Sequence, residues 1–177
     1  NLPPNIYMVQ AQADGYNTVA ELDETNNISP PCAFEVVASD LRVTNVMFLG
    51  PPIAGKPAAV RWTVVNGGNY PAKAGWYDWV AASTNSSLSG VICYQSIWHS
   101  VDLSPGGVYH TTNTLNVPAL PDATLNLIVQ ADRWNAVAET SEANNSSASI
   151  PFTVLSPDLV VIRLGAPTAA ASGATII

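Results

Sequence analysis

The chain carries the stretch Asp132-Arg133-Trp134-Asn135-Ala136-Val137-Ala138-Glu139, which is followed by Glu142 and by Asn144-Asn145. The same pattern occurs 118 residues earlier (132 − 14), as Asp14-Gly15-Tyr16-Asn17-Thr18-Val19-Ala20-Glu21 with Glu24 and Asn26-Asn27. At this offset residues 1–59 align with residues 119–177 without a gap. A fixed period of this length indicates a tandem array of one domain type.

The chain between the two copies alternates apolar and polar residues, as in Asp40–Phe48, which is the period-two pattern of half-buried β-strands. Turn residues such as Ser104-Pro105-Gly106-Gly107 separate these stretches. We expect strands at 40–48, 59–66, 76–83, 90–100, 108–117, 123–131 and 148–155. The pattern predicts an all-β fold, an immunoglobulin-like sandwich of seven strands.

The period divides the chain into three parts. Residues 39–155 form one complete repeat, residues 1–38 the last strands of a preceding repeat, and residues 156–177 the first strand or strands of a following one. Because the sequence begins and ends partway through a repeat, we expect it to belong to a longer chain. A lone two-stranded hairpin is marginal in water, so each partial repeat should need further strands to complete its fold.

The core should rest on apolar packing, because neither the second nor the sixth expected strand contains a cysteine that could form the usual immunoglobulin disulfide. Its candidates are Trp62, Val64, Leu127, Val129 and Val137.

The two cysteines, Cys32 and Cys93, lie in different repeats. They could form a disulfide between the linker region and the next domain, pair outside this sequence, or remain thiols.

The composition excludes several functions. Only 11% of the residues are charged and the net charge is −7, so nothing here would neutralise nucleic-acid phosphates. No apolar run reaches the 18 residues that a membrane span needs. Four N-glycosylation sequons favour a secreted or cell-surface protein that carries N-linked glycans: Asn27, Asn85, Asn144 and Asn145.

The acidic pattern at each copy has two interpretations. Carboxylate and amide oxygens suit calcium, which takes six to eight such ligands. Alternatively, Asn and Asp stabilise tight turns, and Val137 plugs the end of the sandwich. The candidate calcium ligands are Asp132, Asn135, Glu139, Glu142 and Asn145, with Asp14, Asn17, Glu21, Glu24 and Asn27 in the first copy.

No arrangement of side chains indicates catalysis. His99 and His110 lack partners at metal-ligand spacing, and Ser104 lies in a turn. We therefore expect no enzyme. The aromatic residues leave a second alternative, since they could form a sugar-binding platform or pack in the core: Trp76, Trp79, Tyr94, Trp98 and Tyr109.

Several ordered pieces of the chain resemble the CARDB (cell-adhesion-related) family of bacterial-type immunoglobulin-like domains. They are Asp40-Leu41 with Val43, Trp62-Thr63-Val64-Val65-Asn66-Gly67-Gly68, Trp76-Tyr77-Asp78-Trp79-Val80 with Ser83, Leu103-Ser104-Pro105-Gly106, Leu127–Asp132 and Asn135–Asn145. The segment Thr84-Asn85-Ser86-Ser87 departs from the family, which carries an Asp-rich run there in many members.

The resemblance implies a spacer or adhesion module without catalytic activity. We predict a structural module of a long extracellular or cell-surface protein: an adhesin, a stalk or a glycosylated filament. Its partners would be adjacent repeats of the same chain and copies of itself or other surface proteins. The alternative is a carbohydrate-binding or calcium-stabilised adhesion module.

Overall fold

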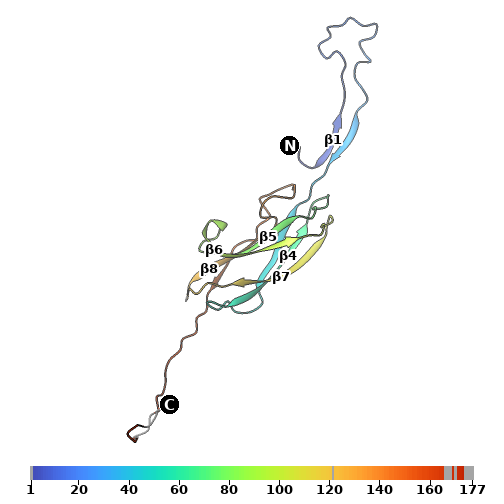
Figure 1. Ribbon diagram of the computed structural model, residues 1–177. Helices are drawn as coiled ribbons and strands as arrows, with labels where there is room; N and C mark the ends of the chain where they lie inside the picture. The colour runs from blue at the N-terminus through green and yellow to red at the C-terminus, as the bar shows by residue number, and fades with distance from the viewer. Residues whose placement is uncertain (1, 121, 166–168, 170, 174–177) are drawn as a thin grey trace.

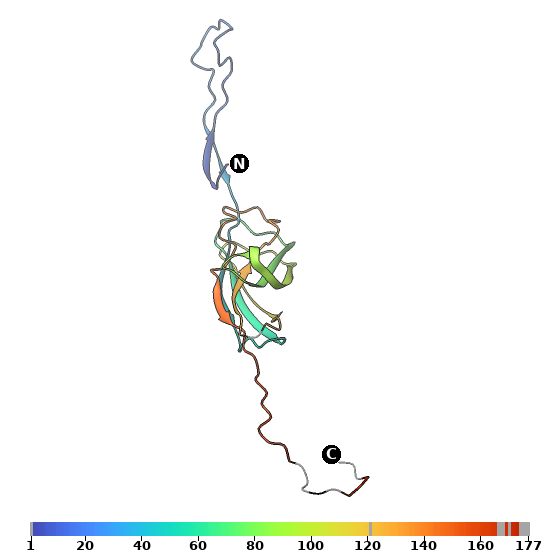
Figure 2. The same ribbon diagram turned by 90° about the vertical axis from the view of Figure 1, so that its left-hand side faces the viewer.

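The computed structural model describes residues 2–120, 122–165, 169 and 171–173, and the described chain is elongated. A two-stranded hairpin lies at one end, a β-sandwich in the middle, and an extended tail that starts at Ser156 leaves the other end (Figure 1). The view turned by 90° shows the same succession along one long axis (Figure 2). Among the described residues, no helix has the length and apolar character to cross a membrane.

The sandwich consists of two antiparallel sheets. The first contains, in spatial order, β3 (Leu41–Phe48), β4 (Pro57–Asn66) and β7 (Val108–Asn116). The second contains β6 (Val91–His99), β5 (Trp76–Ser83), β8 (Thr124–Gln130) and β9 (Ile150–Thr153). A short 3-10 turn, η1 (Leu88–Gly90), precedes β6. The strand positions predicted from the alternation agree with these bounds to within two residues.

The core fills the space between the two sheets. Strand β4 buries alternate residues from Ala58 to Val64, as the period of a strand requires. The opposite sheet contributes inward-facing residues from β5 and β8. The predicted core residues are confirmed, since each is at least 93% buried: Trp62, Val64, Leu127, Val129 and Val137.

A buried carboxylate lies at the centre of this core. Asp78 on β5 is fully buried and shares its face with Trp76 and Val80. Its oxygens accept hydrogen bonds from the indole nitrogens of Trp62 (3.3 Å) and Trp76 (3.2 Å) and from the hydroxyl of Tyr109 (2.5 Å).

The ring of His99 completes the surroundings of Asp78. Its Nε2 atom lies 3.0 Å from Asp78 Oδ2, and its ring stacks on that of Trp76. Burial and the nearby negative charge of Asp78 raise the pKa of Tyr109, so the hydroxyl stays protonated and able to donate. The carboxylate therefore links side chains of both sheets.

Replacing Asp78 with Ala should destabilise the sandwich by roughly 3–5 kcal/mol, because it leaves several buried donors without an acceptor. Urea unfolding monitored by tryptophan fluorescence measures the loss. Asp102→Asn is the control, since its ion pair with Lys73 is solvent-exposed and should contribute little. Equal stability of the Asp78→Ala and wild-type chains would contradict this role of Asp78.

The hairpin consists of β1 (Asn5–Val9) and β2 (Cys32–Val36) and repeats the geometry of β8 and β9. Tyr7 pairs with Phe34 in the hairpin, and Leu125 pairs with Phe152 at the equivalent place in the sandwich. The hairpin lacks a facing sheet, so its apolar side chains, such as Ile6 and Met8, are about two-thirds exposed.

The tail also leaves apolar residues in solvent. Its residues Leu159–Leu164 have no β partner, and they stand at the positions that β3 occupies one period earlier. Residues 174–177, which also belong to the predicted third part, lie outside the described residues.

Both cysteines are free thiols in the structure, which is one of the three states that the sequence leaves open for Cys32 and Cys93. Cys32 is exposed and pairs with Val9 at the end of the hairpin ladder remote from the sandwich. Cys93 is half-buried on β6, where burial raises its pKa. The hairpin projects away from the sandwich (Figure 1).

Candidate functional site: the acidic loop and the linker

A tight turn shaped by Asp132 begins the acidic loop after β8. Asp132 and Asn135 adopt left-handed backbone conformations, with φ of 41° and 51°. The buried carboxylate of Asp132 accepts hydrogen bonds from the backbone amides of Ala136 (2.9 Å) and Val137 (2.7 Å). Asn and Asp tolerate this conformation better than other side chains, which accounts for their positions in the motif.

The first copy of the motif forms the same turn. Asp14 and Asn17 have φ of 38° and 53°, and the Asp14 carboxylate accepts from the amides of Thr18 and Val19. Hydrogen bonds to these amides lower the pKa of Asp14. The local sequence therefore suffices for the turn, which forms without a sandwich around it.

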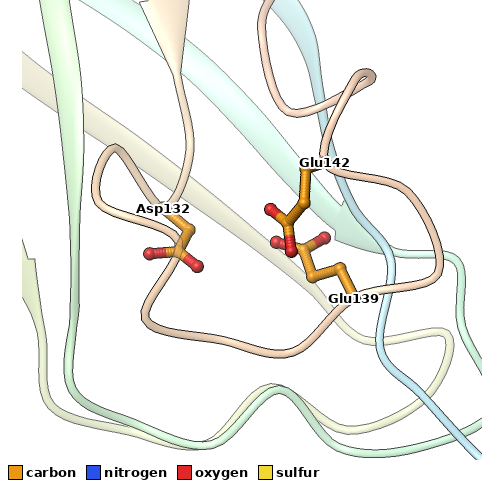
Figure 3. A group of neighbouring side chains, drawn as sticks. All are labelled: Asp132, Glu139 and Glu142. Atoms are coloured by element: carbon orange, nitrogen blue, oxygen red, sulfur yellow. The ribbon is translucent and has the colours of Figure 1, made fainter. Parts of the chain in front are cut away.

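Three carboxylates converge in the second copy. One oxygen each from Asp132, Glu139 and Glu142 lie within 4.8 Å of one another. Figure 3 shows the Glu139 and Glu142 carboxylates side by side, with Asp132 facing them across the loop. The amide nitrogen of the buried Asn145 donates to Glu139 Oε1 (2.9 Å) and to Glu142 Oε2 (3.2 Å).

The pKa of Glu139 is raised to about 7 by burial and, secondarily, by the charges of Glu142 and Asp132. The pKa of Glu142 is raised by burial and by the charge of Asp132. The loop thus carries a carboxyl group that titrates near neutrality.

Glu139 holds the chain segment that enters the sandwich. Its Oε2 accepts from the backbone amide of Leu41, the first residue of β3. Beside it, the Thr140 amide donates to the Ser39 carbonyl (2.8 Å), and the Ser39 hydroxyl donates to the Ala138 carbonyl (2.9 Å). We call residues 38–41 the linker and these contacts with the acidic loop the linker clamp.

A second turn holds the linker from the other side. The buried Asn66 side chain accepts from the Asp40 amide (3.0 Å) and donates to the carbonyls of Tyr70 and Leu103. A Cβ on Gly68 would lie 2.3 Å from the Ala38 carbonyl oxygen, so only glycine fits there. This packing explains the Asn66-Gly67-Gly68 motif physically.

The structure brings together only some of the predicted calcium ligands. Asp132, Glu139, Glu142 and Asn145 meet, but Asn145 presents its nitrogen to the glutamates, and Asn135 is exposed. In the first copy Asn17, Glu21 and Glu24 are exposed, Asp14 and Asn27 are half-buried, and the acids among them form no such cluster. Glu24 there accepts from the Glu21 amide and from the Asn27 side chain.

The sequons differ in accessibility. Asn85 is exposed in the turn before η1. Asn145 is fully buried, and its amide nitrogen, the atom that a glycan would modify, bridges two glutamates. The amide nitrogens of Asn144 and Asn27 are bonded to Asp40 and Glu24. Asn85 is the exposed one of the four sequon residues, although its amide nitrogen also donates to Ser89 Oγ (3.2 Å).

The aromatic residues, for which the sequence left open either a sugar-binding platform or packing in the core, divide between the two places. Trp76 is 1% exposed and Tyr109 is largely buried, because both contact Asp78 in the core. Tyr94 and Trp98 are about half exposed.

Sequence reasoning missed Asp78 and the Glu139–Leu41 contact. Asp78 alternates along β5 on the same side as Trp76 and Val80, and this pattern could have shown that Asp78 points inward. Leu41, the partner of Glu139, is 98 residues away, so the local sequence gave no sign of their contact.

No protein-family model and no curated protein sequence matches the chain. Among solved structures, the chain is similar to the CARDB domain of a Pyrococcus furiosus protein in complex with di-metal ions (17% identity, 68% of this chain, 96% of that one, TM-score 0.48). The solution structure of that domain gives 21% identity, coverage of 68% and 98%, and a TM-score of 0.49. A domain of a candidate cell surface protein from Methanosarcina acetivorans is 18% identical, with 67% of this chain and 93% of that one covered and a TM-score of 0.45. The similarity to CARDB domain structures thus occurs at low sequence identity.

Stability should depend on the ionisation of Glu139. The pKa of Glu139 is raised from 4.5 to about 7 in the folded chain. The stability that this carboxyl group adds to the folded state is therefore fully present below about pH 4.5 and is lost as the pH rises through about 7. Replacing Glu139 with Gln should remove this component from the pH profile of the unfolding free energy. Glu21→Gln, at the exposed equivalent position, is the control and should leave the profile unchanged. Parallel profiles of wild type and Glu139→Gln would rule out this titration.

Proposed function

We propose that this chain is a structural spacer segment of an extracellular or cell-surface protein. In this proposal residues 39–155 are one complete immunoglobulin-like unit of seven strands. The hairpin of residues 1–38 and the tail of residues 156–177 belong to further units of the same kind, in a tandem array. The clamped linker is the observation that carries the proposal, because it would make the orientation between successive units a property of the fold.

The equivalence of the two copies supports the tandem array. The isolated bridge Gln12–Ile28 recurs as Gln130–Ser146, one period later. The Ala13 amide donates to the Asn27 carbonyl at 2.9 Å, and the equivalent bond from Ala131 has the same length. The exposed apolar faces of hairpin and tail are what strands lacking their facing sheet would show.

Direct contacts between hairpin and sandwich support a fixed junction. Asn69 donates from its side chain to the Glu35 carboxylate (3.0 Å), and its side-chain oxygen accepts from the Ala38 amide (3.1 Å). The amides of Asn69 and Tyr70 both donate to the Ala38 carbonyl. A linker bonded along its length bends less than a flexible one of the same number of residues.

Partners and location follow from this role. Adjacent repeats would be the first partners, and copies of the chain or other surface proteins would pack laterally in a stalk or filament. The sparse charge suits such packing, and the exposed Asn85 would carry an N-linked glycan on the outside of the assembly.

The proposal predicts a single hairpin orientation. Spin labels on Cys32 and on Thr112→Cys, in a Cys93→Ser background, should give one narrow distance distribution by pulsed electron paramagnetic resonance. Gly68→Ala should broaden it, because the new Cβ displaces the linker. Gly50→Ala is the matched control, since its Cβ would meet nothing within 4 Å. A broad distribution in the wild-type background would contradict the spacer role.

Calcium binding by the acidic loop is the second candidate. Three carboxylates within 4.8 Å, one with a pKa near 7, would gain from a cation, and the buried Asn145 Oδ1 has no hydrogen-bond partner. The existing donors to Asp132 and Glu139 favour a hydrogen-bonded network instead.

A chelator separates these two roles of the loop. If calcium is structural, adding a chelator should lower the melting temperature, and calcium should restore it. The Glu142→Gln variant should lose that response, because it removes one ligand. Identical melting of the wild-type chain with and without chelator would exclude calcium as a stabilising element.

A further inference from the structure

An aromatic patch covers the outer face of β5 and β6, on the side of the sheet away from the core. Tyr77 and Trp79 alternate with the buried residues of β5 and therefore point outward. The ring of Tyr77 lies 4.8 Å from that of Trp98, and the ring of Trp79 stacks on Tyr94 at 4.2 Å with planes 14° apart. We call these four residues, with Arg133 and Trp134, the aromatic face.

The aromatic face is accessible to a ligand. Tyr77 is 39%, Tyr94 51%, Trp98 52% and Trp134 63% exposed. Four large rings this exposed on one face are unusual for a surface without a partner, since contiguous apolar patches commonly mark binding sites. The rings are not coplanar, since Tyr77 and Trp98 are tilted by 55° and Trp134 stands edge-on to Trp79 at 82°, but they lie on neighbouring strands and form one continuous surface.

A single positive charge lies within the aromatic face. The guanidinium of Arg133 is 4.6 Å from the ring centre of Trp79 and 5.1 Å from that of Trp134. The Arg133 amide donates to the Tyr77 carbonyl, which fixes the loop on β5. Arg133 makes no ion pair with any residue the structure describes, although the chain carries a net charge of −7. A cation held between two rings without an acid is complementary to an anionic ligand.

Unpaired polar atoms lie beside the rings. Trp79 Nε1, Gln130 Oε1 and Arg133 Nε are buried without hydrogen-bond partners. Gln130 is the strand partner of Trp79, so these groups cluster at one end of the aromatic face. Buried donors and acceptors normally have hydrogen-bond partners. A ligand that moves a ring edge or a loop side chain aside could bring its hydroxyl groups to these three atoms and supply the missing partners.

We propose that the aromatic face binds a carboxylate-bearing polysaccharide. The apolar faces of sugar rings pack against the exposed sides of Trp98 and Tyr94, while sugar hydroxyls bond to the polar edge. Arg133 pairs with a uronate carboxylate, for which its planar guanidinium provides parallel donors. The site stands apart from the spacer role and would attach the array to an acidic glycan matrix.

Calorimetry with polygalacturonate, its methyl-esterified form and dextran sulfate tests this proposal on the whole chain. Wild type should bind polygalacturonate more tightly than the ester. Trp98→Ala should weaken binding of both by about tenfold or more, whereas Arg133→Gln should weaken only the binding of polygalacturonate, by a similar factor. Tyr16→Ala is the matched control, because Tyr16 occupies the position equivalent to Trp134 in the hairpin copy and is 94% exposed. It should bind as wild type does.

Several results would overturn the proposal. These are no binding of any of the three polymers, equal affinities of wild type and both variants, and tighter binding of dextran sulfate than of polygalacturonate, which would indicate charge alone. Dimerisation of the chain that Trp98→Ala abolishes would instead identify the face as a protein interface. Thermal melts of each variant establish that the fold is retained.

Discussion

The hydrogen bond from the Leu41 amide to the Glu139 carboxylate is the contact that fixes where the chain enters the sandwich. It joins the first residue of the sandwich to a loop 98 residues later, and Ser39 and Thr140 extend the connection into a short parallel bridge. The linker is therefore part of the fold rather than a tether between folds. Because the Glu139 carboxyl is half-buried beside Asp132 and Glu142, the contact has an electrostatic cost, which protonation near neutral pH relieves.

The interior shows a comparable use of a carboxylate. Asp78 collects donors from Trp62 and Trp76 and from Tyr109, and so joins side chains from both sheets. Such a centre constrains the relative position of the sheets without a covalent bond. It also divides the aromatic residues into two sets, since rings that bond to Asp78 are held inward and those of the opposite strand parity face solvent.

Much of the fold could be predicted from the sequence because the strands follow local alternation, and the five proposed core residues are buried. The turns at Asp14 and Asp132 were also predictable, since their geometry depends on residues within five positions. The sequence left open whether Trp76 lies in the core or on the surface, and the pairing of Glu139 with Leu41 was not predictable, because it joins residues 98 positions apart. The burial of Asn145 in the sequon could not be predicted for the same reason, since it arises only when the loop closes on Glu139 and Glu142.

Amide hydrogen exchange at two equivalent leucines tests the linker clamp most directly. Leu41 and Leu159 follow an aspartate one period apart, but Leu41 is fully buried and bonded to Glu139, whereas Leu159 is 92% exposed. The account predicts that the Leu41 amide exchanges as slowly as core amides such as that of Val64, while Leu159 exchanges at the rate of an unstructured chain. Rapid exchange at Leu41, comparable with that at Leu159, would contradict it.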